Sequence, residues 1–395
     1  EEHPQTVSHF LAHKAEVLQM NGWSEGSAAA LTYERRLMQP EATAWVGFSN
    51  IASGVFGAAA VFLFGAAVAA NRRDDARGVP VGLGLLGAGM VVLVLINASK
   101  GAIAASVFGG ALVMVGLLPG AIGAFFRKWL GVCIGLGCLA VVGVIVARGA
   151  VDEDFLGDRS VLFRSHYLDA GLAMIEANPL VGVGPSGFQE LYPSVRPLRS
   201  PETPASAHSM WLDWVVSFGI AGSAWVVLMG LLIVRRVKNT DAFSGRGVET
   251  STAVTAALVV FGAVLGVHVW AEGAALDPGG LFVRVLGVTL AVMTAALLAD
   301  ALRTVSTDVM HRLALCGAAV IVVQAQLEML VWQPGSVAIV WAFVGVAGTA
   351  RAGRFKHAAT GWPWILAVVA LVVGIRLVLA EAQQRRAVEP LYYLA

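Results

Sequence analysis

The sequence predicts an all-α protein, a polytopic transmembrane bundle of about ten spans with one large exterior loop that contains short helices. Of its 395 residues, 57% are hydrophobic and only 13% are charged, whereas a soluble domain carries about 25% charged residues. The mean hydropathy is +0.74, and apolar runs recur along most of the chain. The formal net charge of +1 gives no indication of a nucleic-acid partner.

Ten apolar runs have, or approach, the length of about twenty residues that a transmembrane helix needs. The ninth run is short, and the start of the third is poorly marked. The predicted spans cover residues 45–70, 79–98, 101–126, 129–147, 210–234, 251–270, 281–298, 313–332, 336–348 and 362–380.

Every second connection between these spans is short and basic, and together these connections hold about fourteen Lys and Arg residues. Because basic loops favour the cytoplasm, the opposite connections are predicted to be exterior. Residues 1–44, the loop 148–209 and the tail 382–395 therefore face outward, with membrane segments at 45–147 and 210–381. An exterior start also predicts that further spans precede residue 1.

A glycine motif occurs in the exterior loop, within the stretch "NPLVGVGPSGFQELYP". Gly182, Gly184 and Gly187 have the G-x-G-x-x-G spacing of a dinucleotide-binding turn, which requires a strand before it and a helix after it. A helical pattern precedes the motif and Pro185 interrupts it, so the sequence argues against a nucleotide site. Gly182 and Gly184 instead permit a tight re-entry of the chain.

The same loop contains an amphipathic stretch over residues 159–178. Leu168, Leu172 and Ile175 recur at helical spacing on one stripe. This pattern predicts a helix that lies on the outer face of the membrane.

Cationic side chains surround one histidine near the predicted outer boundary. His208 comes directly before the fifth long span, Arg164 lies in the exterior helix, Lys100 stands between two spans, and Arg35 and Arg36 close the first exterior segment. Histidine is suited to accept a proton near neutral pH. Arg and Lys are suited to bind phosphates. The sequence offers no carboxylate cluster for a metal ion.

Each of these residues also has a simpler interpretation. His208 could cap a helix or lie in the membrane interface, Arg164 could anchor a lipid headgroup, and Lys100 could snorkel to the surface. His9 and His13 are spaced as two metal ligands would be, but no third ligand accompanies them. Other polar or sulfur-containing residues in apolar runs are accounted for by pairing, by snorkelling or as core filler: His268, Glu272, Arg284, Arg376, Cys133, Cys138 and Cys316.

The order of these motifs resembles the O-antigen ligase and O-antigen polymerase family. His208-Ser209, followed by Gly219 and Gly222, is similar to the signature that closes the catalytic loop of that family. "NPLVGVGPSGF" resembles its Pro-Leu-x-Gly-x-Gly segment, and "RSHYLDAGLAMIEANPL" resembles its arginine-containing helix, with Leu168 where Trp is usual. "ASKGA" resembles its Ser-Arg-Gly turn, with Lys100 in place of Arg.

The resemblance implies a metal-independent glycosyltransferase of the bacterial inner membrane, with its active site on the periplasmic face. The donor would be a glycan on polyprenyl (undecaprenyl) diphosphate, and no cofactor is implied. His208 would be the catalytic base, and Arg164, Lys100, Arg35 and Arg36 would bind the diphosphate. The loop-shaping glycines would be Gly182, Gly184, Gly187, Gly219 and Gly222.

The sequence leaves the acceptor open. A ligase of lipopolysaccharide biosynthesis would use lipid A core, a polymerase would use another lipid-linked repeat, and a protein O-oligosaccharyltransferase would use a protein. A transporter or flippase of lipid-linked sugars is an alternative of another class. It would favour charged residues in the middle of several spans, whereas the charges here gather at the outer boundary.

Overall fold

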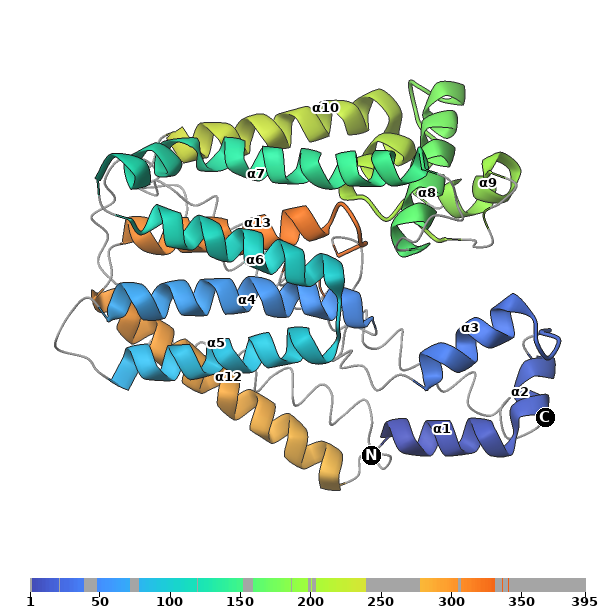
Figure 1. Cartoon of the computed structure of the whole chain (residues 1–395), viewed down its shortest axis with the longest axis horizontal. Coiled ribbons are helices and arrows are strands. Elements are labelled where there is room, and N and C mark those ends of the chain that lie inside the picture. The colour runs from blue at the N-terminus through green and yellow to red at the C-terminus, as the bar shows by residue number, and fades with distance from the viewer. Residues whose placement is uncertain are drawn as a thin grey trace, which may run out of the picture. The chain divides into compact units, whose positions relative to one another are not determined.

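The computed structural model of the chain describes most of its first 240 residues and parts of the remainder. The described residues are 2–20, 22–38, 48–71, 78–118, 120–151, 159–185, 187–197, 200, 204–238, 278–304, 307–330, 336 and 340. All regular elements in these ranges are helices (Figure 1). The all-helical class predicted from the sequence is confirmed for this part of the chain. The chain divides into two compact units.

Three short helices begin the first unit: α1 (Glu2–Ala12), α2 (Lys14–Met20) and α3 (Ala28–Leu37). Lys14 of α2 forms an ion pair of 3.0 Å with Glu34 of α3. The rings of Phe10 and Tyr33 contact each other in an edge-to-face arrangement, with centroids 5.5 Å apart. A polar contact and an aromatic contact therefore connect these N-terminal helices.

Small residues allow three apolar helices of the first unit to approach closely. They are α4 (Ser49–Ala70), α6 (Lys100–Gly116) and α13 (Thr307–Gln324), the first and last of which belong to this unit only in part. A Cβ placed on Gly109 of α6 would lie 2.5 Å from Val320 of α13, and one on Gly54 of α4 would lie 2.7 Å from Leu330. Helices in membranes commonly pack through small residues in this way.

Four further helices complete the part of the first unit that matters for the site. The helices α7 (Gly120–Gly149) and α10 (Met210–Lys238) lie side by side, and α8 (Arg159–Ala177) packs against both. The short α9 (Gly187–Val195) packs against α8 and α10. Figure 1 shows α8 crossing one end of the α7–α10 pair.

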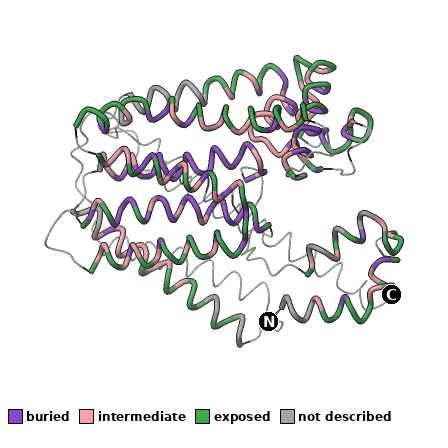
Figure 2. The backbone as a smooth tube through the Cα atoms, in the orientation of Figure 1, coloured by how far each residue is buried: buried purple, intermediate pink, exposed green. Residues whose placement is uncertain are grey.

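Large apolar side chains remain exposed on α7 and α10, including Leu136, Leu139, Val144, Val227 and Leu228. Figure 2 shows exposed residues along the outward side of both helices, whereas α4 and α13 are largely buried. Apolar side chains that face away from the protein are typical of helices in contact with lipid.

The second unit contains α12 (Pro278–Thr304) and part of α5 (Gly78–Ile96). A Cβ on Gly82 of α5 would lie 3.0 Å from Leu297 of α12, and one on Gly87 would lie 3.2 Å from Phe64 of α4. Glycine again provides the close approach between helices.

Four described helices are long and apolar enough to cross a membrane. They are Ser49–Ala70, Gly78–Ile96, Lys128–Gly149 and Met210–Leu228, with shorter apolar helices at Lys100–Gly116, Val285–Asp300 and Val309–Gln324. A multi-pass membrane protein is therefore supported, but the predicted number of about ten spans is not established. The predicted spans at 251–270 and 362–380 lie outside the described residues, as does nearly all of 336–348.

Two predicted span boundaries were wrong. The third span was expected to reach residue 126, but α6 ends at Gly116 and the residues from Gly120 onward belong to α7. Gly120 has a φ of +79°, a conformation that glycine adopts without strain. The eighth span was expected to end at residue 332, but α13 ends at Gln324 and a turn follows it. Neither boundary is marked by a charged residue.

Candidate active site

A small apolar core fixes α8, α9 and the start of α10 relative to one another. It is formed by Tyr167, Ala170, Met174, Phe188, Tyr192, Ala207 and Val216. The hydroxyl of Tyr192 also lies 2.7 Å from the Oγ atom of Ser200. The amphipathic helix predicted over 159–178 is confirmed as α8. Ala170 and Met174 on one side enter this core, while Leu172 of the predicted apolar stripe is exposed.

The glycine segment of the exterior loop packs into a break in α10. Gly219 has φ 56° and ψ −130°, so the helix is interrupted there. The amides of Val183 and Gly184 donate to the carbonyl oxygens of Val216 and Ser217 at 2.9 and 3.0 Å, and the amide of Ile220 donates to Leu180 O at 3.3 Å. The loop thus provides partners for main-chain groups around the break.

The positions of the five candidate loop-shaping glycines differ in their steric requirements. A Cβ on Gly182 (φ +70°) would lie 2.5 Å from the carbonyl oxygen of Val216, and one on Gly219 would lie 2.7 Å from the amide of Gly182. Gly222 lies directly against the main chain of Trp214. Gly187 begins α9 against Val183, whereas Gly184 (φ +84°) faces open space.

His208 lies in the short segment that enters α10 and has a φ of 54°. Such a left-handed conformation is uncommon for residues other than glycine and is often found at functional sites. The amide of His208 donates to Ser206 Oγ at 3.1 Å. Its ring packs on Tyr167, with centroids 5.4 Å apart.

Neighbouring contacts hold this segment in place. The amide of Ala207 donates to Asp213 Oδ1 at 2.7 Å, so a side chain in the first turn of α10 accepts a hydrogen bond from the segment that precedes it. The amide of Met210 donates to Ala325 O at 2.7 Å. Ser209 Oγ donates to Gln326 Oε1 at 3.4 Å. The start of α10 is therefore joined to the turn after α13.

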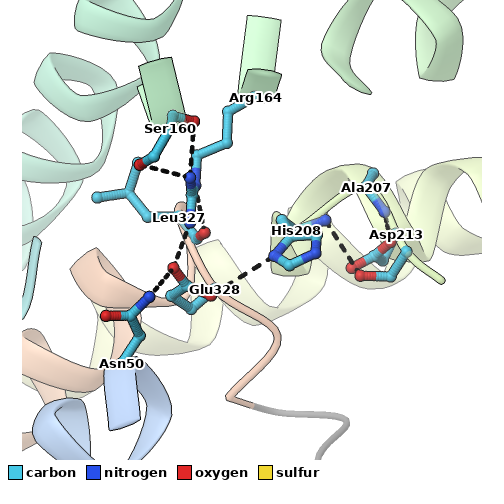
Figure 3. A network of polar contacts seen from close by, with 9 residues as sticks. Asn50, Ser160, Arg164, Ala207, His208, Asp213, Leu327 and Glu328 are labelled. Carbon is cyan, nitrogen blue, oxygen red and sulfur yellow. Dashed lines mark hydrogen bonds and ion pairs between the residues drawn. The ribbon is translucent and has the colours of Figure 1, made fainter. Parts of the chain in front are cut away.

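Glu328 lies in that turn and faces His208. Its Oε2 atom is 3.5 Å from His208 Nδ1, while Oε1 forms an ion pair with Arg164. Asn50 Nδ2 also donates to Oε1 at 3.3 Å. Figure 3 shows that Arg164 and His208 approach the carboxylate from two directions. Glu328 is only 7% exposed, so its charge is compensated by these neighbours rather than by water.

The protonation of Glu328 reflects this setting. Burial raises the pKa of its carboxyl group, but the contact with His208 and the positive charge of Arg164 outweigh that effect. The pKa consequently lies below its ordinary value, and the group is a carboxylate at neutral pH. The turn therefore presents a buried negative charge to the imidazole.

Arg164 uses all three guanidinium nitrogens within the protein. Its Nε donates to Leu327 O at 2.6 Å, one terminal nitrogen donates to Ser160 O and Oγ at 2.7 and 2.9 Å, and the other pairs with Glu328. Arg164 thereby connects α8 to the turn that carries Glu328. This engagement was not anticipated for a residue expected to bind a diphosphate.

The other predicted cations lie elsewhere in the first unit. Lys100 is the first residue of α6 and is exposed. Its neighbour Gly101 lies against Gln324 and Leu327, so Lys100 is at the same end of α6 and α13 as Glu328. Arg35 and Arg36 belong to α3, but their side chains lie outside the described residues.

The two histidines considered as metal ligands lie near the end of α1. The rings of His9 and His13 stack on each other at 4.5 Å between centroids. His268, Glu272 and Arg376 lie outside the described residues, as does the side chain of Arg284.

Sequence reasoning missed Glu328, Asn50 and Asp213. Glu328 stands in a run otherwise assigned to a membrane span, where it follows Gln324 and Gln326 at alternate positions. Ionisable and polar residues in such a run are expensive and often functional. That signal could have identified the turn, although not its histidine partner.

The comparison with protein families matches residues 84–227 to the family described as O-antigen ligase. The matched segment contains Lys100, Arg164, His208 and all five candidate loop-shaping glycines, and it ends before Glu328. No curated protein and no solved structure matches the chain. The resemblance found in the motifs is thus confirmed over this segment.

Proposed function

We propose that this chain, whose residues 84–227 match the O-antigen ligase family, is a membrane glycosyltransferase that moves a glycan from a polyprenyl-diphosphate carrier to an acceptor hydroxyl. The reaction takes place on the outer, periplasmic side of a bacterial inner membrane, following the assignment of the basic loops to the cytoplasm. The family match supports the reaction class. The polar network at the start of α10 supports the identity of the reacting groups.

The 3.5 Å approach of His208 Nδ1 to Glu328 Oε2 carries the proposal. A carboxylate at Nδ1 favours the tautomer that has its proton there, which leaves Nε2 as the proton acceptor. The same pairing of a carboxylate with a catalytic imidazole orients the base in unrelated enzymes. His208 is thus suited to act as a general base through Nε2, with Glu328 as the positioning residue.

The proposed step is a single displacement at the anomeric carbon. The acceptor hydroxyl gives its proton to His208 Nε2 while its oxygen forms a bond to the anomeric carbon. The bond between that carbon and the phosphate oxygen breaks, and polyprenyl diphosphate leaves with the electron pair. The donor supplies the free energy, so this mechanism requires no nucleotide, and cationic side chains rather than a metal ion would neutralise the leaving diphosphate.

Positive charge near the leaving diphosphate would lower the barrier, because negative charge grows on the bridging oxygen as it departs. We assign this role to Lys100, which is exposed at the end of α6 nearest Glu328, together with Arg164. Glu328 already pairs with Arg164, so we assign Lys100 as a second positive charge at the diphosphate. Arg35 and Arg36 are further candidates for the diphosphate.

The acceptor is proposed to be lipid A core, as in a ligase. A second lipid-linked repeat or a protein hydroxyl would react by the same proton transfer and displacement. The geometry of His208 and Glu328 suits any of these hydroxyl groups.

Transfer by the purified protein in proteoliposomes tests the proposal. A synthetic polyprenyl-diphosphate glycan is offered with lipid A core, with a second donor molecule or with an acceptor protein, each with and without EDTA. We expect a product with lipid A core that EDTA does not reduce. Product with another acceptor would reassign the acceptor, and an absence of transfer to all three would refute the proposed reaction.

A further inference from the structure

The loop between α8 and α9 exposes two large apolar side chains. Leu180 is 69% exposed and Val181 is 78% exposed. Residues 180–184 have the sequence "LVGVG", which contains no polar side chain. Ile220 of α10, whose amide donates to Leu180 O, is 63% exposed. These three residues form an apolar surface at the break in α10.

The main chain of this loop is joined to α10 rather than left to water. Three hydrogen bonds connect the loop to α10, through Val183 N, Gly184 N and Leu180 O. A fourth joins Gly182 N to Asn178 O at 3.0 Å. Irregular backbone is tolerated within a membrane where its polar groups find partners in the protein. The loop largely meets this condition, because the amides of Val183 and Gly184 donate to α10 and that of Gly182 donates to Asn178, while Leu180 and Val181 remain exposed.

The position of the break along α10 places this surface at membrane depth. The basic pair Arg235 and Arg236 marks one end of the apolar part of α10, and Trp211 and Trp214 mark the other. Counting about twenty residues back from Arg235 reaches the vicinity of Trp214. Gly219 then lies about 7 Å below that boundary at 1.5 Å per residue.

We propose that residues 180–184 enter the hydrocarbon layer of the membrane as a re-entrant loop. Leu180, Val181 and Ile220 contact lipid acyl chains and continue the lipid-facing surface formed lower on α10 by Val227 and Leu228. Burial of Leu180 and Val181 in lipid keeps their apolar surface from water and anchors the α8–α9 connection. This inference goes beyond glycosyl transfer, since the loop can enter the membrane whether or not the protein is a transferase.

Site-directed spin labelling of the full chain in vesicles tests this inference. Single cysteines at Leu180, Val181, Ile220 and Gln189 are introduced after Cys133, Cys138 and Cys316 are replaced by Ala. Ile220→Cys is the positive control on α10, and Gln189→Cys, exposed on α9, is the control outside the proposed membrane surface. The vesicles contain phosphatidylcholine and phosphatidylglycerol and no polyprenyl lipid. Accessibility to oxygen is compared with accessibility to a water-soluble nickel chelate.

We expect the ratio of oxygen to nickel accessibility at positions 180 and 181 to match that at 220 and to exceed that at 189 several-fold. A ratio at 180 and 181 equal to that at 189 would overturn the proposal. Nickel access at 180 and 181 that disappears only when polyprenyl diphosphate is added would also overturn it, because the surface would then belong to the donor. Because two loop positions are labelled separately, a local perturbation caused by one spin label can be recognised from the result at the other position.

Discussion

The imidazole of His208 and the carboxylate of Glu328 face each other across two segments far apart in the sequence, with Nδ1 and Oε2 3.5 Å apart. If this contact positions the base, Glu328→Gln should lower the single-turnover rate by a factor on the order of 10² or more. Donor affinity should not fall, because Gln leaves the positive charge of Arg164 in place.

A loss of donor affinity in proportion to the rate would mean that Glu328 has only a structural role. Gln326→Ala is a useful control, since Gln326 lies in the same turn and contacts Ser209 rather than His208. The control variant should retain most of the wild-type rate. Rapid-quench measurements with radiolabelled donor would separate the two variants.

The pH dependence of stability follows from the lowered pKa of Glu328. A carboxyl group whose pKa is lower in the folded state stabilises that state above its unfolded pKa, about 4.5 here, and this contribution is lost as the pH falls through the folded pKa. The wild type should therefore exceed Glu328→Gln in Tm at pH 7. The difference should narrow below about pH 4.5, as measured by thermal unfolding in detergent. A difference that widened on acidification would contradict the assigned charge.

Two substitutions of His208 separate its role in catalysis from the effect of its backbone conformation on stability. His208→Ala and His208→Gly should both lose transfer by a factor of about 10² to 10⁴. Because the φ of His208 is 54°, only glycine adopts that conformation without strain. The Gly variant should thus be the more stable of the two by up to about 1 kcal/mol. Equal stability would indicate that the left-handed conformation is not maintained, and wild-type activity in either variant would remove His208 from the mechanism.

The motifs within residues 84–227 were predictable from the sequence because each has a local signal. Gly182 and Gly219 have the backbone conformations for which glycine is required, and His208 stands at a marked helix start. Glu328 was not predictable in the same way. Its role depends on the tertiary fold, which brings the turn after α13 against α8 and α10. No spacing in the sequence predicts that contact.

Helix boundaries within apolar sequence were predictable only approximately. The transition from α6 to α7 near Gly120 and the end of α13 at Gln324 occur without a charged marker. The contacts of Arg164 were also hidden, because a sequence cannot indicate that a buried carboxylate and two main-chain carbonyls occupy its donors. The predicted role of Arg164 at the diphosphate consequently needs its own test.

Arg164 and Lys100 should respond differently to conservative substitution. Arg164→Lys should be nearly as damaging as Arg164→Ala, because one ammonium group cannot reproduce the contacts to Ser160, Leu327 and Glu328. Lys100→Arg should retain most activity, and Lys100→Ala should weaken donor binding, since position 100 requires only positive charge. Donor affinities and single-turnover rates would be compared for all four variants. Unchanged donor affinity in Lys100→Ala would remove Lys100 from the diphosphate site.

The close packing of Gly182 against α10 predicts that alanine substitutions at Gly182 and at Gly184 differ strongly in their effect on stability. Gly182→Ala must place a Cβ 2.5 Å from the main chain of α10 in addition to straining a φ of +70°. Gly184→Ala strains the backbone at φ +84° but meets open space, so it should lower the free energy of unfolding by only about 1 to 2 kcal/mol. Gly182→Ala should lower the free energy of unfolding several times as much, because main-chain atoms cannot move aside as a flexible side chain can.

Gly89→Ala is the matched control, because Gly89 lies within α5 and a Cβ there would meet nothing within 4 Å. Ala is favoured over Gly inside a helix by roughly 1 kcal/mol, so this variant should be as stable as the wild type or more stable. Thermal unfolding of the three variants in detergent would give the order Gly89→Ala, Gly184→Ala, Gly182→Ala, from most to least stable. If Gly182→Ala were no less stable than Gly184→Ala, the loop would not pack into the break in α10, because the clash would then be absent.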